Sequence, residues 1–197
     1  MNANEILTAK AGTTTRATVA RILDHWNRAT PAQREQGAQW YGEAQQVASD
    51  MVASKPGLTL EAAAAVIAHL SPRTSWARNV AGAMALVTTG EAPACIGANV
   101  DRARAALTAS NPLETVRGPK TAAFARNILG DPDVVTVDVW AVRIALGDQD
   151  DPELVLRKSG VYDAVAHCYR LAARKAGVSP STMQAATWIV SRGGRAA

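Results

Sequence analysis

Residues 60–70, with the sequence LEAAAAVIAHL, are almost entirely apolar and rich in alanine. Because alanine has the highest helix propensity of the amino acids, the segment predicts an α-helix. A helix that is apolar on every side has to be buried all round, so we expect other elements to enclose this one. Pro72 follows and ends the helix, since a proline disfavours the helical conformation of the residue before it.

The rest of the chain carries the same kind of signal. Apolar residues recur at every third or fourth position, as at Val19, Ile22 and Trp26, which is the period of an amphipathic helix. Side chains that cap helix N-termini precede such runs at Thr30, Asn99, Asp138, Asp151, Ser159 and Ser179. The only β-like run, residues 134–137, is short enough to be an extended connector. We therefore expect an all-α, compact multi-helix fold.

Length and composition restrict the class of protein. With 197 residues, 48% of them hydrophobic, the chain is expected to form a single helical domain over 1–197 or two closely packed lobes. The formal net charge is +4, and basic residues concentrate between Arg102 and Arg126, which suits a polyanionic partner. The chain shows neither a signal-peptide core nor a long apolar stretch, so we expect a cytoplasmic protein, bacterial or from a phage-infected bacterium, without membrane contact.

The two cysteines indicate no metal chemistry. Cys95 and Cys168 are far apart and lack the spacing of metal ligands, so neither a zinc site nor a cysteine-held iron–sulfur cluster is expected. Two buried, reduced thiols are the simpler interpretation. The sequence calls for no cofactor and identifies no protein partner.

The segment 116–122, VRGPKTA, predicts a tight glycine turn that opens directly into a helix. Pro119 suits the first helical position, and Gly118 permits close approach of a ligand. Unpaired backbone N–H groups at a helix start, together with Arg117 and Lys120, favour binding of a phosphate, with Thr121 in the same turn. The alternative is an ordinary turn between two helices with a basic first turn.

The chain beyond this turn resembles a known family. After Lys120 come an uninterrupted helix, Gly130, an extended run and the sequence VDVWAVR at 137–143. This order resembles the helix-hairpin-helix DNA glycosylase superfamily, which includes endonuclease III, with the motif here at about 111–130. Residues 67–79, IAHLSPRTSWARN, are similar to an earlier segment of the same superfamily, so the resemblance covers roughly 62–146. The chain is also similar to glycosylase-like proteins of bacteriophages linked to hypermodified thymine.

The resemblance implies double-stranded DNA as the partner and a base flipped out of the duplex as the target. Asp138 matches the catalytic carboxylate, and Lys120 matches the position of a Schiff-base lysine in bifunctional members. Arg73 matches the residue that fills the vacated stack, while Trp140 and Trp76 are the candidates to stack on the flipped base. In the alternative interpretation Asp138 only caps its helix, Lys120 only meets phosphate, and the tryptophans belong to the core.

The chain also departs from the superfamily pattern. Gly118-Pro119 replaces the usual pair of glycines, Arg73 stands where a glutamine is usual, and Trp140 stands where a histidine is frequent. The alternatives are therefore a noncatalytic helix-hairpin-helix DNA-binding protein, a phage enzyme of DNA base hypermodification, or a helical bundle that binds a free nucleotide or a protein. All base chemistry depends on one expectation, that Asp138 and Lys120 face a shared cleft.

Overall fold

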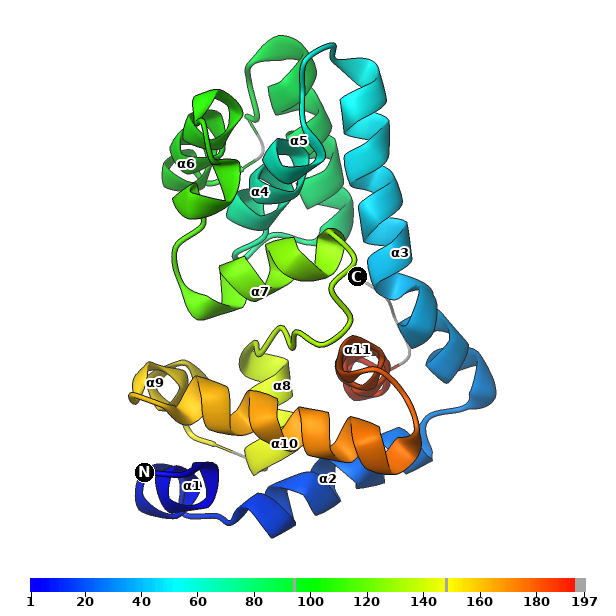
Figure 1. Ribbon diagram of the computed structural model, residues 1–197, viewed down its shortest axis with the longest axis vertical. Helices are drawn as coiled ribbons and strands as arrows, with labels where there is room; N and C mark the ends of the chain where they lie inside the picture. Colours follow the sequence, from blue (N-terminus) through cyan, green and yellow to red (C-terminus); the bar gives the residue numbers. More distant parts are fainter. Residues whose placement is uncertain (94, 148, 194–197) are drawn as a thin grey trace. The chain divides into compact units, whose positions relative to one another are not determined.

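The computed structural model describes residues 1–93, 95–147 and 149–193. Over these residues the regular structure is entirely helical, with eleven α-helices, one short 3-10 helix and no β-strand (Figure 1). The expected all-α fold is confirmed. Residues 134–137 form the extended connector that the sequence predicts.

The chain divides into two units. Among the described residues, unit 1 consists of Met1–Trp40 and of residues from 132 to 193, and unit 2 consists of Tyr41–Asp131. Unit 1 contains α1 (Ala3–Ala11), α2 (Thr15–Arg28), the first part of α3 (Pro31–Ser54), α8 (Val139–Leu146), α9 (Pro152–Arg157), α10 (Val161–Ala176) and α11 (Pro180–Ser191). Unit 2 contains the rest of α3, α4 (Leu60–Leu70), α5 (Trp76–Thr89), α6 (Gly97–Thr108), the 3-10 helix η1 (Pro112–Thr115) and α7 (Pro119–Ile128).

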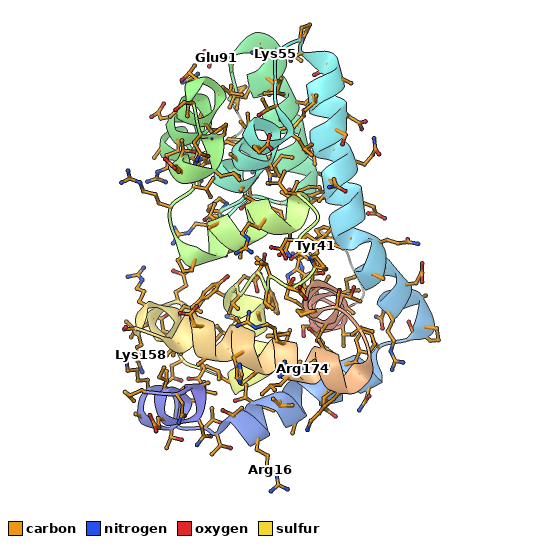
Figure 2. All side chains as sticks on the ribbon, in the orientation of Figure 1. Arg16, Tyr41, Lys55, Glu91, Lys158 and Arg174 are labelled. Carbon is orange, nitrogen blue, oxygen red and sulfur yellow. The ribbon has the colours of Figure 1, made fainter. Side chains whose placement is uncertain are left out.

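Helix α4 is the centre of unit 2. Every residue from Ala62 to Leu70 is buried, and α4 packs against α5, α6, α7 and η1 (Figure 1). Small alanine side chains allow the neighbouring helices to come close on all sides, which is the environment that the uniformly apolar sequence predicts. At the end of α3, Lys55 donates a hydrogen bond of 3.1 Å to the carbonyl of Val87 on α5 (Figure 2).

Helix α10 is the centre of unit 1, where it packs against α1, α2, α9 and α11. Its apolar face carries the fully buried Val165, Tyr169 and Ala172, and the core continues through Ile22 of α2 and Met183 of α11. Burial of this shared apolar surface is the main source of stability for such a helical unit.

Most of the predicted helix starts are confirmed. The side chain of Asp138 accepts from the backbone N–H of Ala141 at 2.8 Å, and Asp151 caps α9 in the same way. Thr30 caps α3 and Ser179 caps α11. In each case the hydroxyl or carboxylate oxygen satisfies one of the N–H groups that the first turn leaves open.

Two predicted caps are wrong by one or a few residues. Asn99 lies inside the first turn of α6, because the carbonyl of Ile96 already accepts from the N–H of Asn99 at 2.9 Å. Helix α10 begins after Gly160 rather than at Ser159. Gly160 has a φ of 82°, a left-handed conformation that glycine adopts without strain, so the backbone favours a glycine at this cap.

Helix α1 was not predicted, although its capping box is visible in the sequence. The side chain of Asn2 accepts from the N–H of Glu5, and the Glu5 carboxylate accepts from the N–H of Asn2. The spacing of these two residues is the signal of a capping box. None of the helices in the described parts of the chain is long and apolar enough to cross a membrane.

Candidate functional site

The predicted glycine turn joins η1 to α7 in unit 2. Gly118 has φ 97° and ψ 136°, a combination that only glycine adopts without strain. A Cβ built at Gly118 would meet nothing within 4 Å, so the conformation of the backbone, and not lack of space, requires a glycine. The open surroundings also leave the turn accessible to a ligand.

The start of α7 leaves several backbone donors open. The first helical hydrogen bond runs from the N–H of Ala122 to the carbonyl of Gly118, and no side chain caps this helix. Pro119 has no N–H, and in the described chain the N–H groups of Gly118, Lys120 and Thr121 have no acceptor. Such donors, at the positive end of a helix dipole, attract an anion.

The basic side chains at this turn carry no counter-ion. Among the described residues, neither Arg117 nor Lys120 forms an ion pair or a side-chain hydrogen bond. Two other arginines of unit 2 are paired: Arg104 binds Glu91 and Asp101, and Arg126 binds Asp131 at 2.6 Å. The glycine turn thus carries positive charge that no described residue neutralises, and this charge favours a phosphate.

His69 anchors the start of the turn. Its Nε2 lies 3.0 Å from the hydroxyl of Thr115, and that hydroxyl donates to the carbonyl of Pro112 at 2.6 Å. Because the single hydroxyl proton of Thr115 is used there, His69 donates through Nε2–H. Burial lowers the pKa of His69 below its ordinary value, and the charge of Arg102 lowers it further. His69 is thus a buried histidine with a hydrogen-bond partner, and it fixes η1 against α4.

Asp138 lies in unit 1, half-buried, at the N-terminus of α8. Two tyrosines of α10 hold the backbone on either side of it. The hydroxyl of Tyr162 donates to the carbonyl of Val135 at 3.0 Å and accepts from the N–H of Val137 at 3.2 Å. The hydroxyl of Tyr169 donates to the carbonyl of Ala141 at 3.4 Å. The carboxylate is therefore held in a fixed position by its cap and by both flanking segments.

The negative charge of Asp138 contributes to a raised pKa of both tyrosines. Burial raises the pKa of Tyr162 to about 12, and the charges of Asp163 and Asp138 contribute to this rise. The pKa of Tyr169 is raised further, again mainly by burial and in part by Asp138. Both hydroxyls stay protonated near neutral pH and serve as donors. Sequence reasoning missed these two residues, because nothing local to α10 indicates that it packs beside residue 138.

The candidate stacking residues lie in different units. Trp140 is half-buried in unit 1, and the guanidinium of Arg143 lies 5.2 Å from the centre of its ring. Trp76 is half-buried in unit 2, with its ring edge-on to Phe124 at 6.4 Å. Tyr41 also packs against Phe124, at 6.3 Å (Figure 2). Trp76 thus contributes to the core of unit 2, as in the alternative interpretation of the sequence. A role in base stacking stays a prediction for both tryptophans.

Arg73 has a strained backbone. Residues 71–74 form a turn closed by a hydrogen bond of 3.3 Å from the N–H of Thr74 to the carbonyl of Ser71. Arg73 is the third residue of this turn and has a φ of 59°, the only positive value at a non-glycine position in the described chain. Turns with proline in second place and a positive φ in third place usually carry glycine or asparagine there. Strain of this kind is typical of functional positions.

A pair of substitutions measures this strain. Both Arg73→Gly and Arg73→Ala remove the side chain and its contacts, but only glycine relieves the left-handed conformation. We expect Arg73→Gly to be more stable than Arg73→Ala by about 1 kcal/mol in urea unfolding. If Arg73 reaches into DNA, both variants bind a duplex more weakly than the natural protein and by the same factor. Equal stability of the two variants would contradict a strained backbone at this position.

The predicted site residues thus form two groups. Unit 2 holds Arg73, Trp76 and the turn of Arg117, Gly118, Pro119, Lys120 and Thr121, and unit 1 holds Asp138 and Trp140. Since Lys120 and Asp138 belong to different units, a cleft shared by them stays a prediction. In the described residues no cluster of histidine, cysteine and carboxylate side chains could hold a metal ion. Cys95 and Cys168 are free thiols, but only Cys168 is buried as predicted, since Cys95 is half-buried.

No curated protein and no solved structure matches this chain. A family model does match it, over residues 4–195. The chain therefore belongs to the family described as "Family of unknown function (DUF7178)".

Proposed function

We propose that the chain is a DNA-binding enzyme that resembles the helix-hairpin-helix DNA glycosylases and acts on the N-glycosidic bond of a base flipped out of a duplex. The observation that carries DNA binding is the start of α7, where three open backbone N–H groups lie beside Arg117 and Lys120, both without counter-ions in the described chain. A phosphodiester offers the negative oxygens that these donors lack. Contacts with phosphate oxygens bind DNA without recognising its base sequence.

The order of elements supports the assignment. The glycine turn and α7 end unit 2, the extended connector follows, and Asp138 then caps the first helix of the returning chain. In the superfamily that the chain resembles, the catalytic carboxylate comes at this point in the order of elements. We assign Lys120 first to phosphate binding, because the open backbone N–H groups and Arg117 beside it also suit an oxyanion. Amine catalysis is the second role that we propose for Lys120.

Base removal gives Asp138 a defined task. The bond between the sugar C1′ and the base nitrogen breaks with its electrons leaving on the base, and water adds to C1′. The proton that the water loses ends on the departing base, and an abasic site remains. The sugar becomes cation-like on the way, so a fixed, ionised carboxylate nearby stabilises the developing charge. The cap at 2.8 Å and the tyrosines of α10 support this role, because they hold the carboxylate in place before substrate binds.

DNA binding by the turn predicts a specific salt dependence. Removal of one phosphate-binding cation reduces the slope of log affinity against log salt by about one. We expect Arg117→Gln and Lys120→Gln each to weaken binding to a fluorescent duplex of any sequence and to reduce this slope by about one, measured by anisotropy. Arg126→Gln is the control, since Arg126 lies on the same helix but is already paired with Asp131. Wild-type binding that does not change with salt would refute the proposal.

Base removal is tested separately, with duplexes that carry damaged or modified thymines. The expected product is an abasic site, detected as a strand break after treatment with alkali. A noncatalytic DNA-binding protein is the second candidate, and one observation favours it: capping α8 is a complete structural role for Asp138. Salt-dependent binding without base release from any of these duplexes would support that candidate instead.

A further inference from the structure

A pocket of about 580 Å³ opens in unit 2 beside the glycine turn. Its walls come from α4, α6, η1, the turn and α7, and besides Pro72 they carry the side chains of His69, Asn99, Arg102, Thr115, Arg117 and Thr121. Two of these side chains are cationic, and among the described residues that line the pocket there is no carboxylate. Within the pocket the positive charge is therefore not neutralised by the protein.

Asn99 positions one of the cations of the pocket. Asn99 is only 6% exposed, and its amide oxygen accepts from Nη1 of Arg102 at 3.2 Å. The hydrogen bond to Asn99 turns Arg102 toward the pocket rather than toward an acidic neighbour.

The other walls restrict the kind of ligand. His69 uses its Nε2–H on Thr115, and the hydroxyl of Thr115 donates to Pro112, so neither of these hydrogens is available. The remaining donors are two guanidinium groups, the amide of Asn99 and the hydroxyl of Thr121, which forms no hydrogen bond with any described residue. A set of this size suits a tetrahedral oxyanion with several acceptor oxygens better than a carboxylate with two.

We propose that this pocket binds the phosphate group of a phosphate ester. The volume exceeds that of a phosphate alone and leaves room for the attached sugar. The phosphate comes either from a DNA strand held at the glycine turn or from a free nucleotide. The pocket extends the proposed function, because Asn99 and Arg102 lie on α6, outside the turn and α7, but it does not depend on base removal.

The test compares two arginines of α6. Arg102→Gln removes a pocket cation, while Arg104→Gln, two residues along the same helix, removes an exposed arginine that is bound to Glu91, Asp101 and the carbonyl of Gly90. The probes are a fluorescent duplex, deoxyadenosine monophosphate, and deoxyadenosine as the control without phosphate. We expect Arg102→Gln to weaken binding of the duplex or of the monophosphate about fivefold or more, and Arg104→Gln to change neither.

Asn99→Asp provides a second variant of nearly the same shape. The added carboxylate repels phosphate, so it lowers the affinity for the same probe as Arg102→Gln, and a thermal unfolding curve verifies that it folds. Loss of monophosphate binding identifies a nucleotide site, whereas loss of duplex binding alone identifies a strand phosphate. The proposal is overturned if neither variant changes the binding of either probe, or if deoxyadenosine binds measurably and as tightly as its monophosphate.

The outcomes separate this pocket from the proposed function. One outcome is duplex binding that depends on Arg117 and Lys120 but not on Arg102, with no binding of the monophosphate. This outcome refutes phosphate binding by the pocket and leaves the proposed function unaffected. Binding of the monophosphate that depends on Arg102, with no salt-dependent duplex binding, overturns DNA binding and leaves the pocket standing.

Discussion

Replacing Gly37 by alanine is expected to destabilise the protein by about 2 kcal/mol, although alanine is the better helix former. Gly37 is buried in α3, and a Cβ there would lie 2.6 Å from the backbone nitrogen, Cα and Cβ of Ala186 on α11. Backbone atoms cannot turn aside as the end of a flexible side chain can, so α3 and α11 have to separate. The contact between Trp40 and Trp188, with ring centres 5.3 Å apart, lies on the same two helices and has to adjust with them.

Gly42 is the matched control on the same helix. A Cβ at Gly42 would meet nothing within 4 Å, so Gly42→Ala keeps only the benefit of higher helix propensity, about 0.5–1 kcal/mol. For a chain of this length, about 2 kcal/mol corresponds to a fall in Tm of about 4–8 °C. Thermal unfolding followed by circular dichroism measures both variants. Stabilisation by Gly37→Ala would show that α3 and α11 do not approach each other this closely.

The second large effect is expected on catalysis, from Asp138→Asn. Asparagine is as good an N-cap as aspartate, so its side-chain oxygen can still accept from the N–H of Ala141. The substitution removes the negative charge while α8 keeps its start. If the carboxylate stabilises the cation-like sugar, base release falls by about 100-fold or more. The measurement is single-turnover formation of abasic sites in a duplex from which the natural protein releases a base.

Asp151→Asn controls for removal of a capping charge. Asp151 caps α9 by accepting from Leu154 at 2.9 Å, so the two substitutions make the same chemical change at the same kind of position. We expect Asp151→Asn to leave base release unchanged, and both variants to be destabilised by only a few tenths of a kcal/mol, because each removes one charge at a helix N-terminus. Full base release by Asp138→Asn would restrict Asp138 to capping.

Much of the fold can be predicted from the sequence because helix signals are local. A cap and the N–H that it binds are three residues apart, as in Asp138 with Ala141 and Ser179 with Thr182, so both members are visible in one short segment. The burial of α4 follows from its composition alone, since an apolar surface on every side has no other stable environment. The glycine turn is predicted in the same way, from Gly118 followed by Pro119.

The parts that could not be predicted depend on contacts between distant segments. Asn99 is a residue type that often caps helices, but α6 begins earlier, and its side chain instead lies in a pocket whose other walls come from α4, η1 and α7. The elements that meet at this pocket cannot be recognised from the sequence around Asn99.

By itself, the sequence determined the helices, most of their caps and the open start of α7, because each depends on hydrogen bonds within one turn. Only the tertiary structure decided that Tyr162 and Tyr169 hold the backbone around Asp138 and that Arg102 turns into a pocket beside Arg117. The physical reason is that the burial of apolar faces selects which helices meet, and apolar contacts carry no short sequence code for their partners.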